Sequence, residues 1–290
     1  MSTKLSARTK LLYGVADGGC ALVTASIQFF LLSYLADVLR YDPAVVGTAL
    51  MVGKLTWDAV NDPLFGYLSD RTRSRWGRRR PYLLFGAVPL GLATWMLFSL
   101  PPGLAGAAAF FVVLGSFLLH DTLQTLVSVS YGALMPELTA DYDERTSLST
   151  VRMAFSVVGY ILGGGMTTLI AGLFRNSLGW SEPAAYSGMG VVFGAIVAVT
   201  VLATALGVRE RPASEVRPSR LPAWRAIVES LRNGPFMKLM AAQFISSYSF
   251  TTLTSQLPFF HVRLKELVHW KSATRTRTET QARQASQAGR

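Results

Sequence analysis

The sequence predicts an all-α polytopic membrane protein, and three observations support that prediction. Half of the 290 residues are hydrophobic and only 16% are charged, whereas soluble domains contain about a quarter charged residues. The apolar residues form runs that approach or exceed the roughly 20 residues needed for a spanning helix. The runs show no alternation at period two, and lipid admits only helices or closed barrels. We therefore expect helices throughout.

Seven apolar segments are candidate spanning helices, and residues such as Tyr41-Asp42-Pro43 and Pro101-Pro102-Gly103 mark turns between them. The first segment is too long for the apolar core of a cleavable signal peptide. The seven segments cover residues 12–38, 44–69, 81–100, 106–135, 148–173, 184–207 and 236–260.

The distribution of basic residues predicts the orientation of these helices. Lys and Arg are concentrated in the amino-terminal tail, in the loop after the second segment and in the stretch after the sixth, whereas the alternate loops hold only Arg40 and Arg175. Loops rich in Lys and Arg stay in the cytoplasm. We expect a multi-pass protein of the cell (inner) membrane with a cytoplasmic amino terminus. The net charge of +11 then reflects topology and contact with membrane lipids, and we expect no nucleic-acid partner.

The domain organisation follows from the spans and the charges. We expect a cytoplasmic tail at 1–11, a six-helix bundle at 12–207, a basic cytoplasmic linker at 208–235 and a seventh helix at 236–260. Residues 261–290 form a basic, low-complexity tail that helix counting would place outside the cell, against the charge rule. We expect this tail to be disordered or frame-shifted, in a truncated product whose later helices are missing or encoded separately as a carboxy-terminal half. The alternative is a genuine seven-helix protein with an unusual tail.

The second apolar segment contains two acids in its interior. Asp58 and Asp62 are four residues apart, which puts them on one helical face, about 6 Å apart along the axis. A charged residue at membrane depth is costly, and two carboxylates on one face repel each other unless a cation binds. Asn61 adds a neutral oxygen, and Pro63 weakens the helix locally. We expect a site for a coupling ion, H⁺ or Na⁺, at Asp58, Asn61 and Asp62; the alternative is a structural ion pair of Asp58 with Lys54 or Arg152.

The loop after this segment is strongly basic, with six arginines between residues 71 and 80. Ion pairs in such a loop can close one face of a transporter in one state and break in the other. The alternative is anchoring to anionic lipids, which is compatible with the first role. The residues we expect to form this gating loop are Gly66, Asp70, Arg71, Gly77, Arg78 and Arg79.

These motifs resemble a known family. The string Gly66-Tyr67-Leu68-Ser69-Asp70-Arg71, followed by Gly77-Arg78-Arg79-Arg80, is similar to the signature loop of the major facilitator superfamily. The string Trp57-Asp58-Ala59-Val60-Asn61-Asp62-Pro63 resembles its glycoside–pentoside–hexuronide:cation symporters, typified by the melibiose permease, as do Tyr13-Gly14-Val15-Ala16-Asp17 and Tyr131-Gly132-Ala133-Leu134-Met135-Pro136-Glu137-Leu138-Thr139. The resemblance covers about residues 10–260.

The resemblance implies the amino-terminal half of a twelve-helix transporter, plus about one helix of the second half. It implies cation-coupled symport of a sugar or glycoside-like solute by alternating access. The alternatives are a lipid or amphiphile carrier of the same family and a non-transporting truncated product. We expect no enzyme activity and no cofactor apart from the coupling ion, because no nucleophile or metal constellation accompanies the acids.

The resemblance also suggests site residues. Asp58 and Asp62 match the cation-binding acids of the family, and Arg152 matches an arginine that contacts substrate. Two acids of the melibiose permease fall at Ala21 and Ser128, so galactoside recognition is not implied.

The remaining polar residues of the predicted bundle complete the expected solute site. Asp121, Gln124 and Ser128 recur at helical spacing and share a face, which should look into the bundle cavity; a structural interhelical hydrogen bond is the alternative for Asp121. The residues expected to bind solute, a small carbohydrate, are Asp17, Asp121, Gln124, Ser128 and Arg152.

Overall fold

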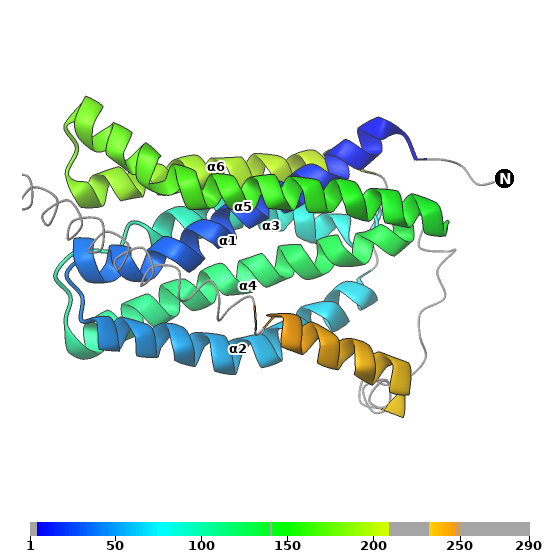
Figure 1. Ribbon diagram of the computed structural model, residues 1–290, viewed down its shortest axis with the longest axis horizontal. Helices are drawn as coiled ribbons and strands as arrows, with labels where there is room; N and C mark the ends of the chain where they lie inside the picture. The colour runs from blue at the N-terminus through cyan, green and yellow to red at the C-terminus, as the bar shows by residue number, and fades with distance from the viewer. Residues whose placement is uncertain (1–4, 73, 140, 209–231, 248, 250–290) are drawn as a thin grey trace, which may run out of the picture. The chain divides into compact units, whose positions relative to one another are not determined.

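The computed structural model describes residues 5–72, 74–139, 141–208, 232–247 and 249, and within these residues the regular structure is entirely helical (Figure 1). This confirms the predicted fold class. The chain divides into two units, Met1–Pro218 and Ser219–Arg290. The helices of the first unit are α1 (Ala7–Ser33), the short π-helix η1 (Tyr34–Val38), α2 (Pro43–Arg71), α3 (Arg80–Leu97), α4 (Gly106–Leu138), α5 (Tyr142–Leu178) and α6 (Glu182–Gly207).

The second unit is described by a single helix. Residues 234–247 are helical and overlap the first part of the segment predicted as the seventh span, 236–260. Most of the predicted linker, residues 209–231, lies outside the described residues, as does the predicted tail at 261–290. These expectations therefore stay predictions.

Polar caps define several helix ends in the first unit. The carboxylate of Asp42 accepts a hydrogen bond from the backbone N–H of Ala44 at 2.8 Å, at the start of α2. Asp141 caps α5 in the same way, and Gly179 ends that helix with a φ of 67°. Caps of this kind satisfy backbone groups that the helix itself leaves open. They allow α5 to begin at Tyr142, before the apolar segment predicted at 148–173.

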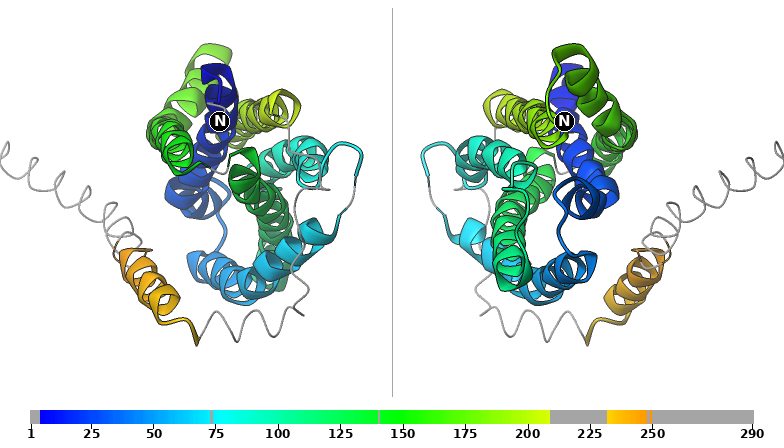
Figure 2. Two further views of the ribbon diagram at one scale, coloured as in Figure 1. Left: turned by 90° about the vertical axis from the view of Figure 1, so that its right-hand side faces the viewer. Right: turned by 90° about the vertical axis from the view of Figure 1, so that its left-hand side faces the viewer.

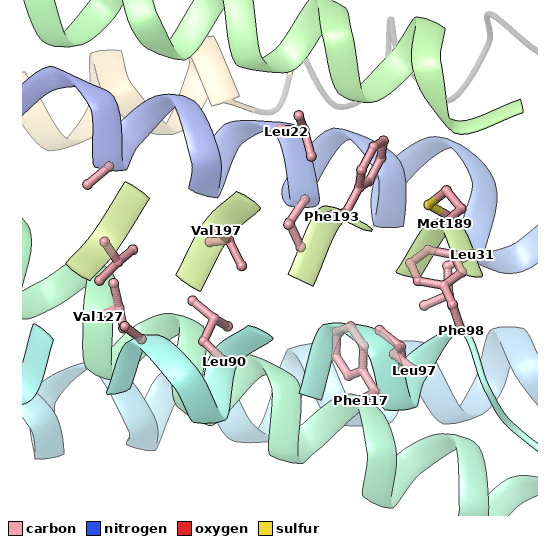
Figure 3. Close-up of a cluster of buried hydrophobic side chains, with 14 of the residues drawn as sticks. Leu22, Leu31, Leu90, Leu97, Phe98, Phe117, Val127, Met189, Phe193 and Val197 are labelled. Atoms are coloured by element: carbon pink, nitrogen blue, oxygen red, sulfur yellow. The ribbon is translucent and has the colours of Figure 1, made fainter. Parts of the chain in front are cut away.

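The six long helices pack in a definite order. α1 packs against α5 and α6, α3 packs against α4 and α6, and α2 packs against α4. End views place α4 between α2 and the pair formed by α1 and α5 (Figure 2). The apolar core lies where α1, α3, α4 and α6 meet, and its side chains include Leu22, Leu31, Leu90, Phe117 and Phe193 (Figure 3).

Glycines bring α1 and α5 unusually close together. A Cβ atom on Gly159 would lie 2.1 Å from the carbonyl oxygen of Gly18, and one on Gly163 would lie 2.2 Å from that of Leu22. Such distances are impossible for a real side chain, so each position requires glycine for a steric reason. Small residues allow this kind of backbone contact between helices in membranes. The contact holds α5 directly against α1.

Four of the described helical segments are long and apolar enough to cross a membrane: Ala7–Val38, Gly106–Leu138, Tyr142–Leu178 and Glu182–Gly207. α3 has only 18 residues and begins at Arg80, and α2 contains the charged residues Lys54, Asp58 and Asp62. Both nevertheless run alongside the other helices of the bundle (Figure 1). The protein is therefore a multi-pass membrane protein.

Candidate cation and solute site

Charged side chains in the middle of the bundle come from four helices. On α3 and α6 the only charged residues are Arg80 and Glu182, which lie in the first turn. The interiors of α1, α2, α4 and α5 each contain at least one charged residue. Charged groups within a membrane face the bundle interior or a hydrated cavity. The site is therefore formed by these four helices, while α3 and α6 act as packing elements.

An ion pair joins α1 to α5. The Nε of Arg152 lies 3.3 Å from Oδ2 of Asp17. The side chain of Arg152 is 35% exposed and that of Asp17 is 18% exposed. The guanidinium also lies over the ring of Tyr131 on α4, 5.1 Å from its centroid, at a distance at which a cation is attracted to an aromatic face. Two residues predicted to bind solute thus contact each other.

Tyr131 is itself fixed by a second tyrosine, Tyr13 on α1. The two rings stack with centroids 4.5 Å apart. The hydroxyl of Tyr131 donates to the carbonyl of Tyr13 at 2.9 Å, and the hydroxyl of Tyr13 donates to the carbonyl of Tyr131 at 3.2 Å. Both polar groups are satisfied although both rings are buried. The sequence prediction gave neither tyrosine a role, although each begins one of the motifs that resemble the family.

A second ion pair joins α2 to α4. The Nζ of Lys54 lies 3.5 Å from Oδ1 of Asp121. The side chain of Asp121 is 11% exposed, whereas that of Lys54 is 60% exposed. One turn further along α2, the indole N–H of Trp57 donates to the hydroxyl of Thr122 at 2.8 Å. Asp121 therefore contacts a neighbouring helix, as expected from the alternative in which it makes a structural interhelical bond. Its partner Lys54 was not among the residues predicted for the site.

A further polar side chain follows each ion pair by one turn, on α4 and on α1. Gln124 lies one turn after Asp121 on α4, and its buried Oε1 has no hydrogen-bond partner among the described residues. Cys20 lies one turn after Asp17 on α1. We call the two ion pairs and these neighbouring side chains the polar row; its members come from α2, α4, α1 and α5 and are Lys54, Asp121, Gln124, Cys20, Asp17 and Arg152.

Ser128 was predicted on the same face of α4 as Gln124. Its side chain is exposed, and its hydroxyl donates to the carbonyl of Thr125 on its own helix at 3.3 Å. The described contacts therefore attach Ser128 to α4 and not to the polar row.

The predicted cation residues differ in their environments. The side chain of Asp58 lies outside the described residues, and Asp62 is exposed. Asn61 is 1% exposed, and neither its Oδ1 nor its Nδ2 has a hydrogen-bond partner. Leaving a buried amide unsatisfied costs about 1–3 kcal/mol. A hard cation prefers oxygen ligands, and the buried Oδ1 of Asn61 is one such oxygen without a hydrogen-bond partner.

The basic loop between α2 and α3 contributes to a compact ionic cluster. Nη2 of Arg78 lies 2.6 Å from Oε1 of Glu137, and Nε of Arg79 lies 3.5 Å from the same oxygen. Arg79 also donates to the hydroxyl of Ser69. The cluster connects the end of α2, the start of α3 and the end of α4, and Gly77 provides the turn with a φ of 108°.

The other predicted residues of this loop lie apart from that cluster. Arg71 covers the ring of Tyr67 on its own helix at 4.4 Å. Gly66 faces open space, and the side chain of Asp70 lies outside the described residues. Glu137, which pairs with both arginines, was missed as a site residue, although it lies in the Met135-Pro136-Glu137-Leu138-Thr139 motif.

A bundle of spanning helices with charged pairs in its interior is typical of membrane transporters. Residues 12–263 match the family described as MFS/sugar transport protein, and the chain belongs to this family. This confirms the resemblance seen in the sequence, and the family is one of transporters and not of enzymes.

Individual relatives agree with this assignment. The chain is 43% identical to an uncharacterized symporter of Synechocystis over 58% of this chain and 32% of the relative. It is 31% identical to the putative glycoside/cation symporter YagG of Escherichia coli over 74% of this chain and 46% of the relative. It is 27% identical to the mouse sodium-dependent lysophosphatidylcholine symporter 1 over 89% of this chain and 53% of the relative. The chain thus spans between a third and about half of these relatives.

Proposed function

We propose that this chain is the cation-binding half of a symporter that uses H⁺ or Na⁺ to drive uptake of a sugar or glycoside-like solute. Two observations support this most directly: the interhelical ion pairs Lys54–Asp121 and Asp17–Arg152 of the polar row, and the buried amide of Asn61, which has no hydrogen-bond partner. The similarity to a putative glycoside/cation symporter supports the same solute class.

The proposed cycle begins with the cation. Bound at Asp58, Asn61 and Asp62, it offsets the repulsion between two carboxylates one turn apart. The solute then binds against Arg152 and the polar groups of α1 and α4, namely Asp17, Asp121, Gln124 and Ser128. Cation and solute raise each other's affinity by the same factor. One positive charge crossing the membrane gains about 2.3 kcal/mol per 100 mV, and alternating access converts this gain into solute accumulation.

A second solute class has specific support. The alignment with the mouse sodium-dependent lysophosphatidylcholine symporter 1 covers 89% of this chain, whereas that with the putative glycoside/cation symporter covers 74%. In addition, Ala21 and Ser128 stand where the melibiose permease has sugar- and cation-binding acids. Transport of an amphiphile with a charged headgroup is therefore the second candidate, and the Asp17–Arg152 pair offers both signs of charge to such a headgroup.

We further propose that transport requires a second bundle beside this one, encoded in the same protein or separately. The relatives are two to three times as long as the aligned part of this chain. Lys54 and Asp62 are exposed on α2, and exposed charges at membrane depth favour a hydrated cavity over lipid. We therefore expect the bundle alone not to transport solute.

Reconstitution tests this proposal. Proteoliposomes containing the chain, alone and co-expressed with any complementary bundle encoded downstream, are loaded with a panel of glycosides or with lysophosphatidylcholine. We expect no counterflow from the bundle alone and cation-dependent counterflow of a glycoside from the pair. Counterflow of lysophosphatidylcholine without that of any glycoside would favour the amphiphile carrier, and a pair that exchanges neither solute with either ion would contradict the proposed function.

We propose that the protein lies in the cell (inner) membrane with its amino terminus in the cytoplasm, because Lys and Arg concentrate in alternate loops. A green fluorescent protein fused at residue 1 is expected to fluoresce, and alkaline phosphatase at the same place is expected to be inactive. The reverse pattern would overturn the orientation. Fusions within the loop between α1 and α2 serve as the matched control and should behave in the opposite way.

A further inference from the structure

Two buried tyrosines lie beside the candidate solute site, and no step of the proposed cycle uses them. The rings of Tyr13 on α1 and Tyr131 on α4 stack with an angle of 16° between their planes, and each hydroxyl donates to the backbone carbonyl of the other residue. Rotating either ring would leave a buried hydroxyl without a partner, which is costly. The orientation of Tyr131 is therefore set by α1, although the residue belongs to α4.

The guanidinium of Arg152 is held from two sides. Its Nε lies 3.3 Å from Oδ2 of Asp17, and its central carbon lies over the ring of Tyr131, 5.1 Å from the centroid. A cation within about 6 Å of an aromatic ring is attracted to the face of the ring. An arginine side chain is long and flexible, and ordering such a side chain on binding costs free energy. The carboxylate and the ring impose this order before a solute arrives.

The residues around the guanidinium come from three helices. Asp17 and Arg152 belong to α1 and α5, whose backbones touch. Tyr131 belongs to α4, which packs mainly against α2 and α3. The stacked pair of Tyr13 and Tyr131 is therefore the contact that brings an aromatic face of α4 to the ion pair between α1 and α5.

We propose that Tyr131, held in place by Tyr13, is a positioning residue for solute binding: its ring keeps the guanidinium of Arg152 in the orientation that receives the solute. This inference rests on the proposed role of Arg152 as a solute ligand. It concerns the arginine side of the site and not the cation site on α2.

The orientation of the guanidinium also indicates what it receives. Nε is turned toward Asp17, so the two Nη groups form the remaining donor edge, and no further partner of this guanidinium is found among the described residues. Two parallel donors match two neighbouring oxygen atoms. Because Asp17 already compensates the charge of Arg152, the pair suits two uncharged hydroxyls of a glycoside better than the oxygens of a phosphate.

Removing the ring of Tyr131 and keeping it should have different effects. Tyr131→Leu leaves Arg152 without its aromatic neighbour, so solute affinity should fall about three- to tenfold, the range expected when one flexible side chain must be ordered on binding. Tyr131→Phe keeps the ring, so affinity should change less than about twofold. Placing 3,4,5-trifluorophenylalanine at this position keeps the shape of Phe but removes electron density from the ring face, and affinity should fall again.

The first measurement is counterflow by the complete transporter in proteoliposomes. The probes are the methyl β-glycosides of glucose, galactose and xylose, with lysophosphatidylcholine in a parallel series. Loss of positioning should raise the solute concentration that gives half of the maximal rate and leave the maximal rate nearly unchanged, as expected when binding alone is weakened. A residue with only a packing role would not distinguish Phe from its fluorinated analogue.

The second measurement follows Arg152 itself and needs no solute. The Nε–H proton signal is recorded by NMR on the purified full chain with isotope-labelled arginine, and it is assigned by its loss in Arg152→Lys. Protons above an aromatic ring resonate at higher field. Tyr131→Leu should therefore move the Arg152 signal to lower field, whereas Tyr131→Phe should leave it close to its wild-type position.

Tyr34→Leu is the matched control. Tyr34 is also a buried tyrosine that lies against a second one, Tyr186, with ring centroids 4.9 Å apart, and it donates to the carbonyl of Phe98 at 2.8 Å, but it belongs to η1. This variant should leave the Arg152 signal and the half-saturating concentration unchanged.

The outcomes separate this inference from the proposed function. If the wild type exchanges a glycoside but Tyr131→Leu matches the Tyr34→Leu control in both measurements, or the fluorinated residue matches Phe, the positioning role is wrong while the proposed function stands. Exchange of lysophosphatidylcholine alone would overturn the hydroxyl pair as the group that Arg152 receives. If the wild type exchanges none of these solutes, the solute site itself is overturned, and the role of Tyr131 with it.

Discussion

Replacing Asp58 by Asn is expected to abolish cation-driven solute uptake, with a loss of cation affinity of at least about 100-fold. Even residues that only orient an ion's ligands cost 10- to 100-fold in metal affinity when mutated, and Asp58 is proposed to contact the ion directly. The neighbouring Asn61 amide would remain buried without a partner. The readout is uptake by the complete transporter with and without an imposed Na⁺ or H⁺ gradient.

Asp37→Asn provides the control for this substitution. Asp37 is exposed in η1, beyond the end of α1, so the same change of charge there should leave uptake unaltered. Cation-dependent accumulation that persists unchanged in Asp58→Asn would remove Asp58 from the site. Loss of uptake in both variants would indicate a general effect of charge or expression and would also contradict the assignment.

The second large effect concerns stability. Glu137→Ala is expected to lower the free energy of unfolding by about 3 kcal/mol, because removing one partner of a buried ion pair leaves charge uncompensated. Glu137 is 9% exposed, and its Oε1 serves both Arg78 and Arg79, whose side chains are 17% and 8% exposed. Denaturant titration in detergent, followed by circular dichroism, measures the difference.

Glu182→Ala is the matched control for that experiment. Glu182 pairs with Arg175 at 3.4 Å, but both side chains are about half exposed. Exposed pairs contribute about 0–1 kcal/mol, so the control should unfold close to the wild type. Equal stability losses in the two variants would show that burial of the cluster does not matter.

The same cluster is our candidate for a cytoplasmic gate. It joins three helix ends through one carboxylate, so a small shift of α4 relative to α2 and α3 would break several interactions together. We propose that it stabilises one state of the transport cycle and opens in the other, as ion pairs at such interfaces commonly do.

The helices could be predicted from the sequence because length and hydropathy define a membrane span. Their ends could not be predicted as well. α5 begins at Tyr142 because the side chain of Asp141 accepts two backbone hydrogen bonds there. The spacing of apolar residues does not reveal this cap, because it lies in a polar stretch. Helices continue into water wherever a cap satisfies their first turn.

The candidate residues of the site could also be predicted, but their pairing could not. Asp17 and Arg152 were proposed separately as solute ligands, and they meet because α1 packs against α5. That contact depends on Gly159 and Gly163 facing particular carbonyls of α1, which no periodicity reveals. Lys54 was considered only as a partner of Asp58 on its own helix. The spacing of apolar residues does not predict that α2 packs against α4, which brings Lys54 to Asp121.

The close contact of Gly159 with the backbone of α1 also constrains how the protein can move. No side chains separate the two backbones at this contact, so a sliding motion of α1 past α5 would produce backbone clashes. We therefore expect α1 and α5 to move together as one rigid unit that carries Asp17 and Arg152. Any rearrangement during a cycle must then occur elsewhere. Such a rearrangement is expected at boundaries that side chains fill, for example between α2 and α4, where Lys54 and Asp121 make an ionic contact.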